Sequence, residues 1–126
     1  MAVCGIAVVT ISACTSPERE VQKHAQKVAS LRATTLSVTE AWLHGHVAGT
    51  YAEGALEQTF QLVQQERAAV ASTPSQLARP HSNAVARDTE AMSRVIAALT
   101  RDVQTGDGTN ARRHLDDLRA ATSEQP

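Results

Sequence analysis

Apolar residues recur along this chain with the spacing of an amphipathic α-helix, three to four positions apart, over most of its length. The first stripe repeats every seven residues and consists of Val21, Val28, Thr35 and Trp42, with Leu31 and Val38 between them. The later stripes consist of Leu56, Phe60, Val63 and Val70; Val85, Met92, Val95, Ile96, Leu99 and Val103; and Ala111, Leu115, Leu118 and Ala121. Helices with such stripes bury them against one another. The pattern therefore predicts four packed helices.

Capping residues, prolines and glycines give the expected helix boundaries. The helices are expected to begin at Pro17, at Thr50, at Ser82 or Asn83 and at Thr109. Gly45 and Gly49 are expected to mark the end of the first helix, near Ala48, and the other helices are expected to end near Ala71, Gly106 and Ser123. Thr50 to Glu53 has the capping-box pattern, and Arg79-Pro80 is expected to stop a short turn before the third helix. The β-branched run of residues 34–39 favours a kink or break in the first helix.

The fold class predicted from these elements is all-α, a small up-down-up-down four-helix bundle. Short connections place successive helices antiparallel to one another. No alternating pattern typical of strands extends over a useful length after residue 13, and no internal repeat is present. Residues 14–126 are therefore expected to form a single helical domain, and residues 1–13 are a separate segment.

The segment before Cys14 has the features of an export signal. Residues 5–11 are mostly apolar, two small residues follow, and the chain becomes polar after the cysteine. The motif Ile11-Ser12-Ala13-Cys14 resembles the lipobox of bacterial lipoprotein signal peptides. The resemblance covers residues 5–14 alone and implies cleavage before Cys14, which would carry the lipid. It further implies an anchored protein in the cell envelope that faces the periplasm or extracytoplasmic space.

Three other interpretations of the N-terminus stay open at this point. Residues 1–4 contain no Lys or Arg, whereas secretory signals begin with a positive region. A misassigned start codon or a cleaved signal without lipid would account for this. A buried strand formed by Val3, Ile6, Val8, Val9 and Ile11 is the third interpretation, and it would need partner strands. Cys4 would leave with a cleaved signal, so Cys14 would be the only thiol of the mature chain.

Composition argues against several function classes. The net charge is −1, and Trp42, Tyr51 and Phe60 are the only aromatic residues, so neither a basic field nor a stacking platform for nucleic acid is expected. The sequence has no glycine-rich phosphate loop and no nucleophile-elbow serine, and we do not expect an enzyme. Asp116 and Asp117 follow Arg112 and Arg113 by four residues, a spacing typical of a solvated, salt-bridged helix surface.

Candidate ligand sites are few, and no cofactor is expected. His44 and His46, with Glu40 before them, are weak candidates for a metal site. The two imidazoles diverge by about 200° on one helix, so they can share a metal only if the helix ends at Gly45. Met92 and His114 could ligate haem iron in principle, but a core methionine is more often a gap filler.

An interaction role is therefore the expected function: a lipid-anchored adaptor, structural element or accessory subunit with an unknown protein partner. Apolar residues outside the main stripes could form a contact face or an isologous homodimer, or could simply widen the core; they are Leu36, Leu43, Val47, Leu62 and Ala69. Arg19, Lys23 and Lys27 form a basic edge that either meets anionic lipid or is an ordinary solvated face. The alternative function is a periplasmic metal- or small-ligand-binding module.

Overall fold

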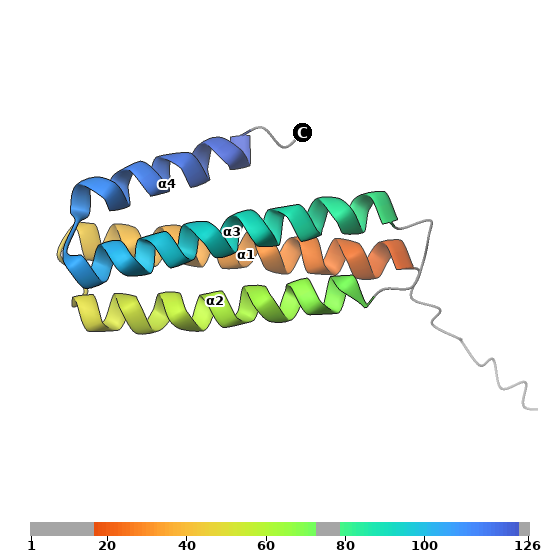
Figure 1. Ribbon diagram of the computed structural model, residues 1–126, viewed down its shortest axis with the longest axis horizontal. Coiled ribbons are helices and arrows are strands. Elements are labelled where there is room, and N and C mark those ends of the chain that lie inside the picture. Colours follow the sequence, from red (N-terminus) through yellow and green to blue (C-terminus); the bar gives the residue numbers. More distant parts are fainter. Residues whose placement is uncertain (1–16, 73–78, 124–126) are drawn as a thin grey trace, which may run out of the picture.

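The computed structural model describes residues 17–72 and 79–123 and confirms the predicted four-helix bundle. The helices are α1 (Pro17–Leu43), α2 (Gly49–Ala71), α3 (Arg79–Thr105) and α4 (Gly108–Ser123). Successive helices alternate in direction, so the order is up-down-up-down (Figure 1). None of the helices in the described ranges is both long and apolar enough to cross a membrane.

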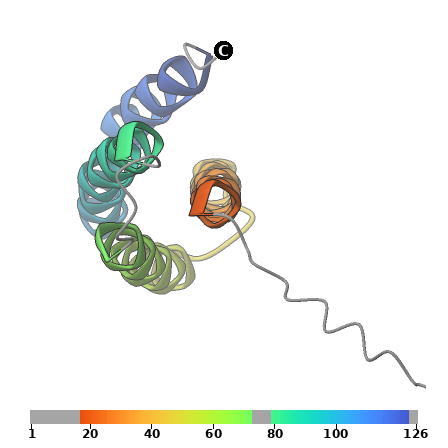
Figure 2. The ribbon, with the colours of Figure 1, turned by 90° about the vertical axis from the view of Figure 1, so that its right-hand side faces the viewer.

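The bundle is open along one seam. Viewed down the helices, α2, α3 and α4 form an arc, and α1 lies on its concave side (Figure 2). The α2–α3 interface is the most extensive, whereas α4 contacts α3 well and α1 only slightly. With 16 residues, α4 spans about 24 Å, compared with about 40 Å for the 27 residues of α1 or α3. The α1–α4 interface is therefore less extensive than the α2–α3, α1–α2, α3–α4 and α1–α3 interfaces.

Two glycines end helices as predicted, although α1 is shorter than expected. Gly45 has φ +73°, its N–H bonds the Trp42 carbonyl (3.0 Å), and the His46 N–H bonds the Ala41 carbonyl (2.8 Å). Gly106 makes the same pair of bonds at the end of α3. This pattern satisfies carbonyls that the last helical turn leaves unpaired. The expected end of the first helix near Ala48 was wrong, because Gly45 already reverses the chain.

The starts of α2, α3 and α4 differ from the predicted ones, and α3 begins at Arg79 rather than after a cap at Ser82 or Asn83. Residue Gly49 begins α2, and its N-cap is Ala48, which makes no side-chain bond. Thr50 therefore lies inside the first turn, and the predicted capping box is wrong. The Asp107 side chain caps α4 instead of Thr109, because its Oδ1 accepts the Asn110 N–H at 3.0 Å.

Proline and threonine residues do not interrupt the helices where a break was expected. Pro80 lies in the first turn of α3, where its missing N–H costs no helical bond. The short turn expected before Arg79-Pro80 falls in residues 73–78, outside the described residues. In α1 the helix continues through residues 34–39, and the hydroxyls of Thr34, Thr35 and Thr39 bond carbonyls four residues earlier. These bonds satisfy the hydroxyls within the helix itself.

The core is formed by the predicted stripes, together with an unexpected set of polar residues. The buried apolar residues are Val21, Val28, Ala52, Leu56, Val63, Val70, Val85, Met92, Ile96, Leu99, Val103, Ala111, Leu115 and Leu118. Ala121, predicted to face inward, is exposed. The buried polar residues are Arg32, Thr35, Thr39, Thr59, Thr89, Ser93 and Asp102. The five hydroxyls bond carbonyls of their own helices, so burial leaves none of them without a partner.

Candidate functional site

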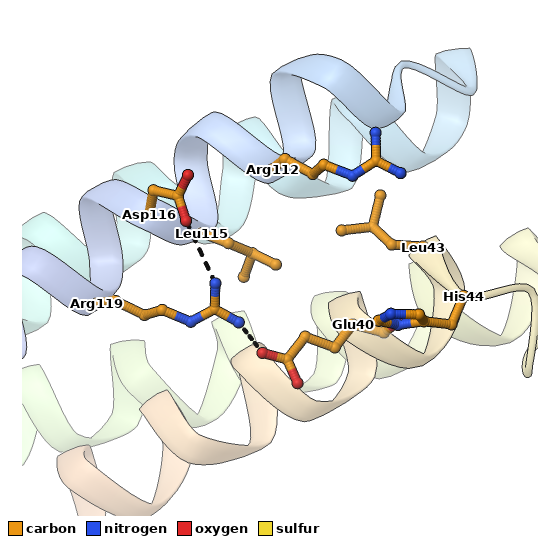
Figure 3. Close-up of a pocket in the computed structure, with 7 residues that line it drawn as sticks. All are labelled: Glu40, Leu43, His44, Arg112, Leu115, Asp116 and Arg119. Carbon is orange, nitrogen blue, oxygen red and sulfur yellow. Dashed lines mark hydrogen bonds and ion pairs between the residues drawn. The ribbon is translucent and has the colours of Figure 1, made fainter.

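The seam between α1 and α4 contains a cavity of about 360 Å³ (Figure 3). It is lined by Glu40, Leu43 and His44 from the C-terminal half of α1 and its end, and by Arg112, Leu115, Asp116 and Arg119 from α4. Small-ligand pockets commonly start at about 300 Å³ and combine apolar walls with a few polar groups. The seam has this character, since two leucines lie among charged side chains.

An ion-pair network crosses the seam. The Arg119 guanidinium contacts the Glu40 carboxylate on α1 and lies 3.3 Å from Asp116 Oδ1 on its own helix (Figure 3). Asp116 was expected to be matched by Arg112 at i,i+4 spacing, but its described ion pair is with Arg119. Both carboxylates of the cavity therefore lie against one arginine. Arg112 extends beside Leu43 at the other end of the cavity.

The structure brings the two predicted histidines together. Because α1 ends before Gly45, the rings of His44 and His46 lie with centroids 5.9 Å apart and planes 31° apart. His44 Nδ1 bonds the Glu40 carbonyl oxygen at 2.9 Å, whereas the Glu40 carboxylate is held by Arg119. Within residues 17–72 and 79–123, no group of three or more His, Cys, Asp or Glu is placed to hold a metal ion. The pair therefore lacks a third ligand from this part of the chain.

The haem interpretation fails on geometry, and His114 has another role. His114 Nδ1 lies 2.6 Å from Asp102 Oδ2, which joins α4 to α3. Met92 is fully buried ten residues before Asp102 on the same helix, or about 15 Å at 1.5 Å per residue. Met92 and His114 consequently cannot ligate the same iron.

The basic edge of α1 is partly neutralised by α2. Glu66 accepts a bond from His24 Nδ1, and its other oxygen lies 3.5 Å from Lys27 Nζ. The Glu66 side chain is 13% exposed, so this carboxylate is largely shielded, and its contacts with His24 and Lys27 join α2 to α1. The edge formed by Arg19, Lys23 and Lys27 therefore presents less positive charge to a surface than its spacing alone indicates.

Arg32 is a functional candidate that the sequence interpretation missed. It is 7% exposed on the core side of α1, and its Nε is buried without a hydrogen-bond partner. None of the hydrogen bonds or ion pairs among the described residues involves its side chain. Its burial could have been inferred from its position on the apolar stripe, four residues after Val28 and three before Thr35. A charged residue is usually assigned to the surface even when it lies on an apolar stripe, so the burial of Arg32 was not predicted.

The off-stripe apolar residues mostly widen the core. Leu36, Leu43 and Val47 are partly buried against it, and Ala69 is also half-buried. Leu62 is 39% exposed and Tyr51 is 63% exposed; they are the exposed large apolar side chains of the described residues. Of the contact face expected from the sequence, the structure leaves Leu62 open.

Comparisons with known proteins identify no relative. No family model matches the chain, and neither the curated proteins nor the solved structures yield a significant match. Cys14, the predicted lipid attachment site, and the signal segment 1–13 lie outside the described residues. The function is therefore inferred from the chain's own residues.

Proposed function

We propose that this protein is a lipid-anchored lipoprotein of the bacterial cell envelope with a non-catalytic interaction role. The observation that carries the proposal is the lipobox-like motif Ile11-Ser12-Ala13-Cys14, with only Thr15 and Ser16 between the cysteine and α1. An anchor at Cys14 would hold the bundle by the end where α1 and α3 begin. A diacylglyceryl group supplies two acyl chains, which is enough for stable membrane binding.

Substitution of the two cysteines in the native host tests the anchor. Cys14→Ser should move the protein from the detergent phase to the aqueous phase in a detergent phase-separation experiment. Cys4→Ser is the matched control and should leave partitioning unchanged, because Cys4 departs with the signal. Mass spectrometry of the wild-type N-terminus should show a lipid-modified Cys14. An intact Met1 with no added acyl mass would overturn the proposal.

The interaction role is supported by what the described part of the bundle offers. Some of its charged and polar groups hold helices together, as in the His24–Glu66 and Asp102–His114 bonds. Leu62 lies exposed on α2, and a partner or a second copy would cover it. Sedimentation equilibrium of wild type and Leu62→Glu distinguishes these occupants. A dimer that the substitution dissociates identifies a second copy, and a monomer in both leaves a different protein as the partner.

A second candidate function, ligand binding by the exported domain, is favoured by the cavity in the α1–α4 seam. It includes the metal hypothesis, since His44 and His46 lie side by side at the same end of the bundle. Calorimetric titration with Zn²⁺, Cu²⁺ and Ni²⁺ tests that hypothesis. Heat that His46→Ala abolishes supports a metal site, and equal heats for both proteins contradict it.

A further inference from the structure

Arg32 carries a buried guanidinium N–H that has no hydrogen-bond partner. The residue is 7% exposed, and the Nε atom is fully shielded from solvent. A guanidinium carries five N–H donors and stays protonated in proteins. Buried charges are normally paired, since an unpaired one loses hydration and gains nothing in return. An anion bound beside Arg32 would remove this penalty.

Helical geometry places Arg32 on the side of α1 that faces α4. Leu43 faces α4, because a Cβ on Gly108 would lie 3.5 Å from Leu43 Cδ2. Arg32 precedes Leu43 by eleven residues, which corresponds to a rotation of about 20° and a rise of about 16 Å. The two helices run antiparallel (Figure 1), so Arg32 lies level with the last turns of α4. It therefore lies at one end of the seam that contains the cavity.

Leucines lie along the seam between Arg32 and the far end of the cavity, inside the exposed Glu40–Arg119 pair. Leu36 shares this side of α1, one turn after Arg32, and is partly buried. Leu43 and Leu115 line the cavity itself. Two arginines line the cavity: Arg119 contacts Glu40 and Asp116, and Arg112 is exposed. Arg32 differs from both of these arginines, because it is 7% exposed and its Nε is buried without a hydrogen-bond partner.

We propose that the α1–α4 seam binds a small amphiphilic carboxylate, with its carboxylate on Arg32 and its hydrocarbon chain directed toward Leu43 and Leu115. The Nε–H and one terminal N–H of a guanidinium form a fork that matches both oxygens of a carboxylate. One negative charge balances one positive charge. The weak α1–α4 contact lets the chain enter without breaking the α2–α3 interface. This inference deepens the ligand-binding function and does not depend on the lipid anchor.

Titration of the full-length chain with acetate, butyrate, hexanoate and octanoate tests the ligand class. Each added CH₂ that enters an apolar seam should tighten binding about 4-fold. The Arg32 Nε–H resonance, identified by its absence in Arg32→Lys, should shift with octanoate and stay in place with octanol. Inorganic phosphate, which has charge but no chain, should bind no better than acetate. Affinity that does not depend on chain length, or an unmoved Nε–H resonance, would overturn the proposal.

Substitution of the arginine separates its role from the general shape of the seam. Arg32→Met keeps much of the aliphatic length, removes the charge, and should weaken octanoate binding at least 10-fold. Arg101→Met is the matched control on the exposed side of α3 and should bind as wild type does. Equal binding by wild type and Arg32→Met would refute the assignment. If Arg32→Met does not fold, the wild-type chain-length series and the Nε–H shift still decide. Metal titration and Cys14→Ser, described above, probe the other functions independently.

Discussion

Asp102 on α3 and His114 on α4 form a bond of 2.6 Å that ties the shortest helix to the rest of the bundle. The two side chains are unequally shielded: Asp102 is 7% exposed and His114 is 27% exposed. Among the described residues, His114 is thus the hydrogen-bond partner of a carboxylate that is almost completely buried. Asp102 also supplies the backbone carbonyl that the Asp107 N–H bonds at the start of the α3–α4 turn. One residue therefore fixes both the turn and the following helix.

Removal of the histidine should destabilise the protein more than its surface position suggests. His114→Ala leaves Asp102 buried without its partner, and a loss of about 1–3 kcal/mol in the free energy of unfolding is expected. His81→Ala, at an exposed position of α3, should change stability by less than about 0.5 kcal/mol. Urea denaturation monitored by circular dichroism measures both. Equal effects of the two substitutions would show that the Asp102–His114 bond adds nothing.

Two glycines should respond to alanine with opposite signs. Gly45 has φ +73°, a left-handed conformation that costs an L-residue about 1–2 kcal/mol, so Gly45→Ala should destabilise by that amount. Gly54 lies within α2, and nothing lies within 4 Å of a Cβ built there. Gly54→Ala should therefore stabilise by about 0.5–1 kcal/mol. Thermal unfolding of the pair gives the comparison, and a shift in the same direction for both would contradict it.

The helical stripes could be predicted because apolar spacing reports directly on burial, and the bundle topology followed from short connections. The polar core residues could not be predicted in this way. Thr89 and Ser93 are buried because their hydroxyls bond their own helix, which makes them equivalent to small apolar side chains. Arg32 is buried because neighbouring helices cover it, a fact that no local pattern contains.

The candidate site was only partly visible in the sequence for a similar reason. His44 and His46 were identified, and their approach depended on the predicted glycine turn. The α1–α4 cavity depends instead on how α4 leans, since α4 contacts α3 more than α1. Asp107 rather than Thr109 caps α4, and this choice sets where the last helix begins.

Leucines on the same helix should differ sharply in their contribution to stability. Leu56 is fully buried, and Leu56→Ala should cost about 2–5 kcal/mol through lost burial and the cavity left behind. Leu62 on α2 is 39% exposed, so Leu62→Ala should cost less than about 1 kcal/mol. The denaturant midpoint of each variant measures the difference. A large loss in Leu62→Ala would mean that an unrecognised contact, such as a dimer interface, covers this residue.

Apolar contact rather than the visible ion pair should hold α4 in place. Leu115 is 2% exposed, and Leu115→Ala is expected to cost about 2–5 kcal/mol. The Glu40–Arg119 pair is 42% and 48% exposed, and such pairs contribute about 0.2–1 kcal/mol because water and salt screen them. A double-mutant cycle with Glu40→Ala and Arg119→Ala isolates that coupling, and added salt should reduce it. A coupling above about 2 kcal/mol, or one that salt does not change, would show that the ion pair, and not Leu115, closes the seam.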